Sequence, residues 1–365
     1  NAGTALGGIT NNGMISGAAS GISVVSAGTI GGVILNNSNG HISGIALRSG
    51  SVIQGEIRNE GTIQGIGAIT VTGSISGVNQ TISGLGQGVV FGASSATMAS
   101  GSYSLVNPLS LQITNSGTAI SVDSTSSINS GIANTGWIVA NGTVSMVGTI
   151  SGGSQLISAI GVGSDLETGS SIGGSLLGQG SVISTGTVSG TQVINKVGVG
   201  LASQDGQSTS GYLSIDTNAY GVGSVQLAGQ VGQRTVAGVG VGMALQNQST
   251  FSGNVQVNTW LVGEGSLSGS NVLAVNQTIA GIGVGLLISD RSTLIGNIYN
   301  TISGQIQGTG TVALRTTGSV QASGIGVGLM IGQSSTLQGS IFNEGLISGA
   351  GSATINGVAA NAATG

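Results

Sequence analysis

The carboxylates are the side chains of this protein best suited to chemistry, and they are few and dispersed. Ten Asp and Glu residues are spread over 365 positions, and the nearest to a pair is Asp165 with Glu167. Two carboxylates on one strand face would suit acid–base cleavage of a glycosidic bond. Isolated acids are more often solvated surface residues, so we interpret this pair as a strand edge or turn. Glu56, Arg58 and Glu60 also alternate, which predicts a surface ion-pair row.

Metal and thiol chemistry have little support in the sequence. The chain has one histidine, His41, and no cysteine, whereas zinc sites need clusters of these residues. Six Lys and Arg residues are scattered along the chain and form no basic footprint for nucleic acid. No stretch approaches the roughly 18 uninterrupted apolar residues of a membrane span. The sequence therefore predicts no enzymatic activity, no catalytic residue, no metal and no cofactor.

The aromatic residues are also too few to predict a row of stacking platforms. Only 2% of the chain is Phe, Trp or Tyr. Trp137 and Trp260 each follow an Asn-Thr step, which suggests equivalent positions in a repeat. The two side chains are either core plugs or outward contacts, and because Trp tends to be buried we favour packing into a core or groove.

A recurring phrase identifies the elements that position these residues. Val239-Gly240-Val241-Gly242 is one of five similar copies, whose first residues are 37, 42, 43 and 43 positions apart. Such a period is typical of a solenoid or array. Its apolar residues alternate with Gly, so we expect one buried face and an outer face of bare backbone. The predicted core positions are Ile160, Val162, Val197, Val199, Val239, Val241, Ile282, Val284, Ile325 and Val327.

Turn residues support stacking of the repeats in register. A polar residue follows the phrase at a constant offset in four copies, which predicts a turn ladder of Asp205, Asn247, Asp290 and Gln333. A second phrase, seen in Asn59-Glu60-Gly61-Thr62-Ile63, returns near Asn11 and Asn343. We expect its Asn or Gly to supply the positive φ of a turn, followed by an inward Ile.

These patterns predict an all-β fold, a single parallel β-helix over residues 1–365. Helix is improbable because Gly, at 72 of 365 residues, costs about 1 kcal/mol at each helix-interior position. The 43-residue period holds enough strand and turn signals for two turns, so we expect about 21 residues per coil, about 17 coils and a length of about 80 Å. Residues 1–158 repeat less regularly than 159–365. Around 91–111, with Pro108, either one coil carries a loop or the repeat has drifted.

At these phrases the sequence resembles the passenger regions of bacterial autotransporter and filamentous-haemagglutinin-type surface proteins. Those passengers are rich in Asn-x-Gly-x-Ile-x-Gly phrases, such as Asn59 to Gly65 and Asn343 to Gly349 here. The resemblance covers nearly the whole chain as a style of repeat. It implies a parallel β-helix, export and an extracellular or cell-surface location. This chain shows no C-terminal membrane barrel, in which it departs from the family pattern.

The composition also bears on function. Charged residues make up 4% of the chain, far below the quarter or more expected on the surface of a soluble monomer. A neutral Ser, Thr, Asn and Gly surface with open strand edges favours self-association. The sequence therefore predicts a structural protein that stacks head to tail into an extracellular fibre or matrix. Its alternatives are a monomeric adhesin or stalk, with a cell-surface or matrix polysaccharide as a further partner, and a β-helical polysaccharide enzyme.

Overall fold

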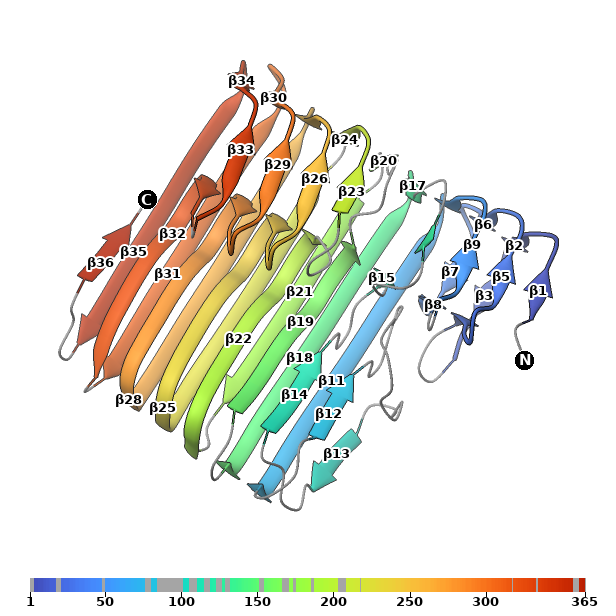
Figure 1. Ribbon diagram of the computed structural model, residues 1–365. Helices are drawn as coiled ribbons and strands as arrows, with labels where there is room; N and C mark the ends of the chain where they lie inside the picture. Colours follow the sequence, from blue (N-terminus) through green and yellow to red (C-terminus); the bar gives the residue numbers. More distant parts are fainter. Residues whose placement is uncertain are drawn as a thin grey trace.

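The computed structural model is a stack of parallel strands, as the sequence predicts (Figure 1). It describes residues 3–17, 21–47, 50–75, 80–83, 101–104, 110–114, 119–122, 127–128, 132–150, 154–165, 171–172, 175–184, 187–202, 208–216, 218–316, 318–332, 334–356 and 361–364. Of these residues, none forms a helix that is long and apolar enough to cross a membrane.

Three short-stranded sheets run along the stack. Sheet A contains β1 (Thr4–Ala5), β5 (Thr29–Ile30), β9 (Val52–Ile53) and β16 (Ser127–Ile128). Sheet D contains β23 (Ser208–Ser210), β26 (Thr250–Ser252), β29 (Thr293–Ile295) and β33 (Thr336–Gln338). Sheet B contains β2 (Ile9–Asn11), β6 (Ile34–Asn36), β10 (Ile57–Asn59), β17 (Ile132–Asn134), β20 (Ser171–Ile172), β24 (Leu213–Ile215), β27 (Val255–Val257), β30 (Ile298–Asn300) and β34 (Ile341–Asn343).

Sheet C is much larger and includes the longest strands. It contains β3 (Met14–Ile15), β4 (Ile22–Val24), β7 (His41–Ile42), β8 (Ile45–Leu47), β11 (Thr62–Ile75), β12 (Gln80–Ser83), β13 (Gly101–Ser104), β14 (Ser110–Thr114), β15 (Ile120–Val122), β18 (Trp137–Ile150), β19 (Ser154–Asp165), β21 (Ser175–Ser184), β22 (Thr187–Ala202), β25 (Ala219–Leu245), β28 (Trp260–Ile288), β31 (Gln305–Thr316), β32 (Ser319–Ile331), β35 (Leu346–Asn356) and β36 (Asn361–Thr364).

Strand pairing shows how many residues make one coil. In the first coils, paired residues of sheet B are 25 and 23 positions apart, from Asn11 to Asn36 to Asn59. From Asn134 to Asn343 the steps are 38, 43, 42, 43 and 43 residues. The expectation of about 21 residues per coil is therefore wrong for the regular half, where one period is one coil. The nine strands of sheet B span about 40 Å at about 4.8 Å per strand, half the expected length.

The extra residues of each long coil form an arm. The chain leaves the body along one strand of sheet C and returns along another, as β31 and β32 do. In β25 and β28 the outward and returning halves are one strand that curves back on itself at the lower edge of Figure 1. One 43-residue period contains the same alternating strands whether it forms two coils or one coil with an arm. The number of strand and turn signals in the sequence therefore could not distinguish these two arrangements.

The irregular region forms a longer coil rather than a drifted repeat. Asn59 pairs with Asn134, so this coil takes 75 residues before it rejoins sheet B. Within it, β13 pairs with β11, and β14 lies between β12 and β19. Leu111 belongs to β14, whereas Phe91 and Pro108 lie outside the described residues. The alternative in which one coil carries an insertion is therefore the one that the pairing supports.

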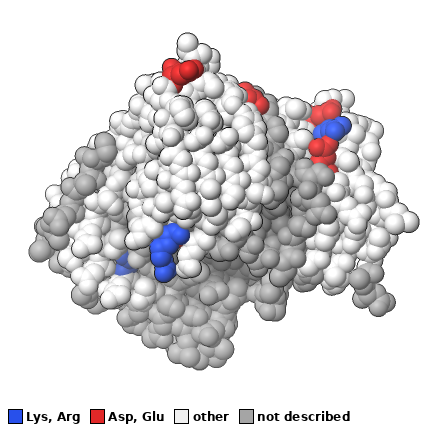
Figure 2. All heavy atoms as spheres, turned by 45° about the horizontal axis from the view of Figure 1, so that its top comes forward, with Lys and Arg blue, Asp and Glu red and all other residues white. Residues whose placement is uncertain are grey.

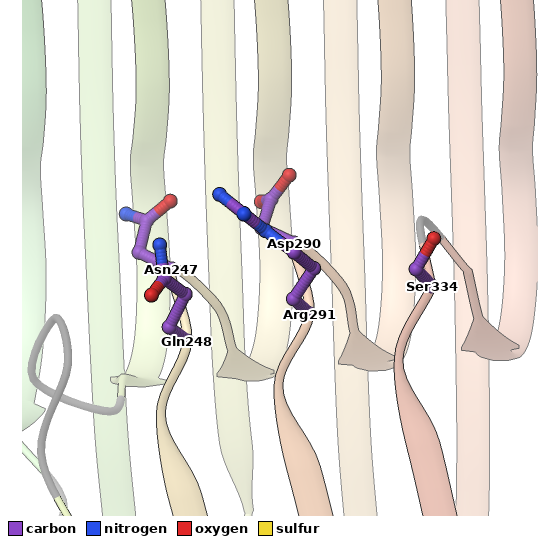
Figure 3. A pocket seen from close by; sticks show the side chains of 5 residues that line it. All are labelled: Asn247, Gln248, Asp290, Arg291 and Ser334. Carbon is purple, nitrogen blue, oxygen red and sulfur yellow. The ribbon is translucent and has the colours of Figure 1, made fainter.

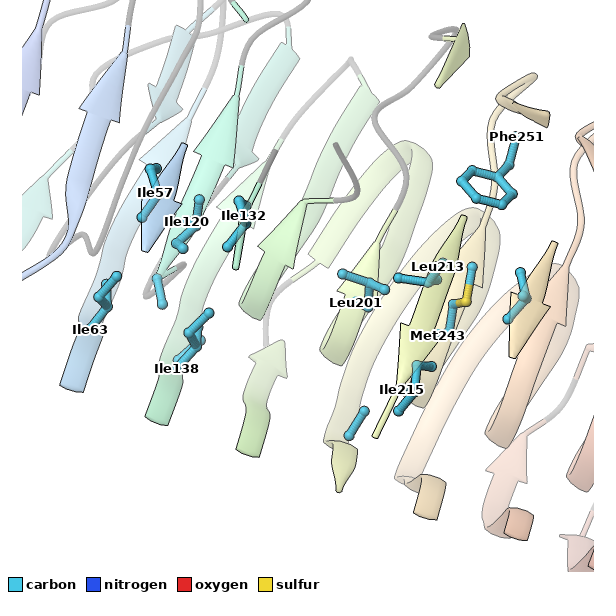
Figure 4. Close-up of a cluster of buried hydrophobic side chains, with 14 of the residues drawn as sticks. Ile57, Ile63, Ile120, Ile132, Ile138, Leu201, Leu213, Ile215, Met243 and Phe251 are labelled. Carbon is cyan, nitrogen blue, oxygen red and sulfur yellow. The ribbon is translucent and has the colours of Figure 1, made fainter. Parts of the chain in front are cut away.

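The body and the arm have separate apolar cores. The body core runs from Ile22 to Ile306 and includes Ile57, Met243 and Phe251 (Figure 4). The arm core brings outward residues such as Val225 against returning residues such as Val236. Each core residue stacks on its counterpart in the next coil, so burial is repeated along the axis, and it is the main favourable term for the fold.

Glycine lets the two layers meet at the root of the arm. Gly240 has φ +65°, and a Cβ placed on it would lie 1.8 Å from the carbonyl oxygen of Glu264. The expected face of bare backbone is therefore a buried contact between layers. The positive φ also rotates the chain, so Val239 packs in the arm core and Met243 in the body core. Val241 joins a third cluster, which corrects the prediction of a single face.

Candidate functional site

A row of asparagine side chains runs through the body beside sheet B. The Asn11 amide nitrogen donates to Asn36 Oδ1 at 2.8 Å, Asn36 to Asn59 at 2.7 Å, and Asn59 to Asn134 at 2.8 Å. Asn300 donates to Asn343 at 2.7 Å in the last coils. We call this row the Asn ladder. Every described bond has the same direction, because each amide nitrogen points toward the next coil.

The Asn ladder gives the second sequence phrase, the one that begins at Asn59, a different role from the turn that we predicted. We expected Asn or Gly of this phrase to supply a positive φ, but none of the six ladder asparagines, and none of Gly13, Gly61 and Gly345, is among the described residues with positive φ. They end strands of sheet B and turn inward, where Asn36, Asn59, Asn134 and Asn300 are buried. The missed signal was the phrase Ile-x-Asn, which recurs at each of these strands. Amide side chains that stack in register satisfy each other's hydrogen bonds.

Three apolar residues interrupt the ladder. Asn134 pairs in sequence register with Ile172, which is followed by Ile215 and Val257 before Asn300. Ile215 and Val257 are buried in the body core. The same inward position is therefore filled in two ways, by hydrogen-bonded amides toward both ends and by packed hydrocarbon between them.

Both ends of the described stack expose residues that are buried elsewhere. Ile341 occupies the inward position of Ile298, yet it is 42% exposed, whereas Ile298 is fully buried. Asn343 is exposed and accepts a hydrogen bond from Asn300. In the repeating pattern its amide nitrogen points to the place of a further coil. At the opposite end Ile9 is only partly buried against the body core, and Asn11 Oδ1 accepts the Gly13 N–H at 3.2 Å.

The predicted turn ladder falls at a corner of the body. Asn247 and Asp290 occupy equivalent places with φ +57° and +56°, and Gln248 N–H donates to the Asp290 carbonyl at 2.9 Å. Asp205 and Gln333 lie outside the described residues. The repeated side-chain bond lies two residues further on, where Ser249 N–H donates to Ser292 Oγ and Ser292 N–H to Ser335 Oγ, both at 3.1 Å.

A polar hollow of about 430 Å³ follows this corner across three coils (Figure 3). Its lining is formed by Asn247, Gln248, Asp290, Arg291 and Ser334. Figure 3 shows these side chains projecting from neighbouring turns on one side of the ribbon. Among the described residues, the lining offers groups that accept and donate hydrogen bonds and no aromatic or apolar anchor.

The predicted core residues stack on one another in register. Ile160 pairs with Val197, which is followed by Val239, Ile282 and Ile325. The second row, Val162, Val199, Val241, Val284 and Val327, pairs in the same way. All ten are buried except Val327, which is partly buried near the uncovered end.

The residues considered for chemistry are not brought together. Asp165 ends β19 beside Ala202, and Glu167 lies outside the described residues. Glu56 and Arg58 form an ion pair, with Glu60 exposed at the following turn. His41 begins β7, in register between Met14 and Thr62. Within the part of the chain that the structure describes, no three His, Cys, Asp or Glu residues gather as metal ligands.

Both tryptophans are on the surface, contrary to our expectation. Trp137 is 57% and Trp260 41% exposed. They do begin equivalent strands of sheet C, since Trp137 pairs with Ser175 and Trp260 with Gln305 at the same corner. The preference for burial failed because each tryptophan precedes the inward residue of its strand, Ile138 or Leu261, and so faces outward.

One charged side chain is buried inside the arm. Arg234 is 2% exposed and donates from Nε to Gln192 Oε1 at 2.6 Å. Its two terminal nitrogens have no hydrogen-bond partner among the described residues. Burial lowers the pKa of the Arg234 guanidinium to about 10. In register it lies between Gln192 and Gln277, so it replaces an amide in a row of glutamines.

In comparisons with protein-family models, curated proteins and solved structures, nothing matches this chain.

Proposed function

We propose that this chain is a non-enzymatic structural protein that stacks end to end into an extracellular fibre or matrix at a bacterial surface. Its partner in the fibre is a further copy of itself. The observation that carries the proposal is the Asn ladder, whose described bonds all run in one direction and can continue into a further coil in the same register. A second copy supplies an acceptor for the Asn343 amide nitrogen at one end of the ladder and a donor to Asn11 Oδ1 at the other.

The join follows from the strand register within the chain. β34 and β2 both have the sequence Ile-x-Asn and occupy the two ends of sheet B. When β34 of one copy pairs in register with β2 of the next copy, Ile341 covers Ile9 of that copy, and the Asn343 amide nitrogen donates to its Asn11 Oδ1. The contact would bury Ile341, which is 42% exposed in the single chain. Because the two ends differ, such a contact does not close on itself and extends as a filament.

The surface favours close packing of copies. The chain carries a net charge of -4 over 365 residues, so little charge repulsion opposes assembly. On the face shown in Figure 2 most of the described surface is uncharged, and the few charged side chains include one group in which a basic side chain lies between two acidic ones. Open strand edges at both ends offer backbone groups for pairing with another chain.

The unequal coils give such a fibre a distinctive outline. The last described coils have arms, whereas the coils of β2 and β6 have only the short body strands. When copies stack in this register, the body strands form a continuous stack through the join. The row of arms is interrupted there, because the next copy begins with short coils. We therefore expect a fibre with one wide and one narrow segment per subunit.

Electron microscopy of the purified chain over a range of concentrations tests the proposal. Fibres with an axial repeat near one subunit length and a periodic narrowing are the expected result. Isolated rods at every concentration would contradict it and would favour the alternative, a monomeric adhesin or stalk.

A pair of variants tests the join itself. Ile341→Lys places a charge in the contact, and we expect it to abolish fibres while the circular dichroism spectrum stays unchanged. Thr354→Lys adds the same charge to an exposed side position of the last coil, and its fibres should persist. Fibre growth by Ile341→Lys at the normal rate would rule out this register.

A further inference from the structure

The buried arginine of the arm has a positive charge that the chain does not balance. Arg234 is 2% exposed, and its Nε donates to Gln192 Oε1. The terminal nitrogens Nη1 and Nη2 carry the other N–H donors of the guanidinium, and neither has a hydrogen-bond partner among the described residues. Burial of such a group is costly, because the guanidinium has lost its water and gained no opposite charge.

Arg234 occupies one place in a row of amide side chains. In register it follows Gln155 and Gln192 and precedes Gln277. The Gln192 amide nitrogen donates to Gln155 Oε1, and Arg234 continues the row by donating to Gln192. Gln277 Oε1 is also without a partner among the described residues. The row therefore offers Arg234 acceptors that are neutral, and these do not balance its charge.

No acidic residue of the neighbouring arm strands can reach Arg234. The strands β21, β22, β25, β28, β31 and β32 contain a single acidic residue, Glu264. Glu264 is exposed and lies beside Gly240 at the root of the arm. About six residues of extended strand, or about 20 Å, separate Gly240 from Arg234. The other residues with a full charge in these strands, Lys196 and Arg315, are cations. The counter-ion must therefore come from the solvent.

We propose that Arg234 binds one small monovalent anion, such as chloride, inside the arm. A halide ion accepts hydrogen bonds from several directions, so one ion can take N–H groups from both terminal nitrogens and cancel their charge. On the same inward face, two residues away, lies Val236 of the apolar arm core. Such surroundings favour a small ion with a single charge, because a dianion such as sulfate would bring a second charge that no group balances.

The bound anion makes the stability of the arm depend on the salt present. A ligand that binds the folded state alone lowers the equilibrium constant for unfolding as its concentration rises. The pKa of Arg234 is about 10, so the dependence on the anion should be present at pH 8 and should weaken at pH 11, where the guanidinium loses its proton. The inference does not depend on end-to-end stacking, since all the residues involved belong to one chain.

Urea denaturation of the full chain at pH 8 tests the site, with sodium chloride exchanged for sodium gluconate at constant ionic strength. At chloride concentrations well above the dissociation constant, the unfolding constant of the unaltered chain should fall about tenfold for each tenfold rise in chloride. Arg234→Gln should lose this dependence. Arg58→Gln is the matched control, because it removes the same charge from an exposed position and should keep the dependence.

A further variant supplies the counter-ion from the chain itself. Gln277→Glu places a carboxylate at the position that is in register with Arg234 in the next coil. In gluconate this variant should be more stable than the unaltered chain, and its stability should no longer rise with chloride. Arg234→Gln should also be the more stable chain in gluconate, because it removes the unbalanced cation.

Two results would overturn the inference. One is an unaltered chain whose stability stays the same when chloride replaces gluconate, which would mean that water or another group of the chain satisfies the guanidinium. The other is an equal dependence on chloride in the unaltered chain and in Arg234→Gln or Gln277→Glu, which would place the effect of chloride elsewhere on the protein.

Discussion

The first coils and the later coils build the same body with very different amounts of chain. Between Asn11 and Asn59 a coil takes 23 to 25 residues, whereas between Ile172 and Asn343 it takes 42 or 43. The added residues go into the arm, which has its own core and meets the body through glycine. The comparison shows that a solenoid can double its coil without changing its central strands, provided that the extra layer stacks in the same register.

The largest effect should come from the glycine contact at the root of the arm. Gly240→Ala would force a Cβ into the backbone of the neighbouring coil at a residue with φ +65°. We expect the free energy of unfolding to fall by about 3 kcal/mol or more. Urea denaturation followed by circular dichroism measures it.

Gly13→Ala is the matched change in a short coil. A Cβ there has open space around it, so we expect a change within about 0.5 kcal/mol. Equal losses for the two substitutions would mean that the close contact at Gly240 is not the cause of its loss of stability.

A smaller effect should follow from breaking the Asn ladder. Asn59→Leu leaves the Asn36 amide nitrogen and Asn134 Oδ1 each without one partner, which should cost about 2 kcal/mol. Ile215→Asn places a lone amide in the apolar interruption and should cost a similar amount. Thermal unfolding compares both with Arg58→Gln, an exposed change on the same strand as Asn59.

Restoring the whole row sharpens this comparison. Asn at positions 172, 215 and 257 together would continue the ladder from Asn134 to Asn300. The triple variant should therefore lose less free energy of unfolding than the sum of the losses of the three single variants. Strict additivity of the three losses would show that the amides do not bond across the coils.

The smallest effect should be a gain of stability in the arm. Arg234→Gln replaces a buried cation by an amide that continues the row of Gln192 and Gln277. We expect unfolding to become less favourable by about 1–2 kcal/mol at pH 8, because an unpaired buried charge is removed. Denaturant midpoints at pH 8 measure the gain, and a loss would show that the guanidinium has a partner.

The pH dependence has a defined sign. Burial lowers the pKa of Arg234 to about 10 in the folded state, so above about pH 10 the unfolded chain binds more protons than the folded chain. Below about pH 10 the buried charge destabilises the folded state by its full amount, and above about pH 10 this destabilisation decreases as the guanidinium loses its proton. The advantage of Arg234→Gln over the unaltered chain should therefore be constant up to about pH 10 and shrink at pH 11.

The sequence alone was sufficient for the fold class and for the residues that stack. Alternation of Val and Ile with Gly indicates strands with one large-residue face, and copies 43 residues apart indicate which residues are neighbours. Val239 and Ile282 are indeed paired. These features depend on local geometry and on repetition, and both can be read without knowing the path of the chain.

Only the tertiary structure decided the coil length, the role of glycine and the surfaces. One period could make two coils or one coil with an arm, because strand pairing is a long-range choice. Gly240 turns the chain through a positive φ, so residues at period two face three clusters rather than one. Trp137 and Trp260 lie outside because each occupies the position before an inward residue, and position in the strand outweighs the general tendency of tryptophan to be buried.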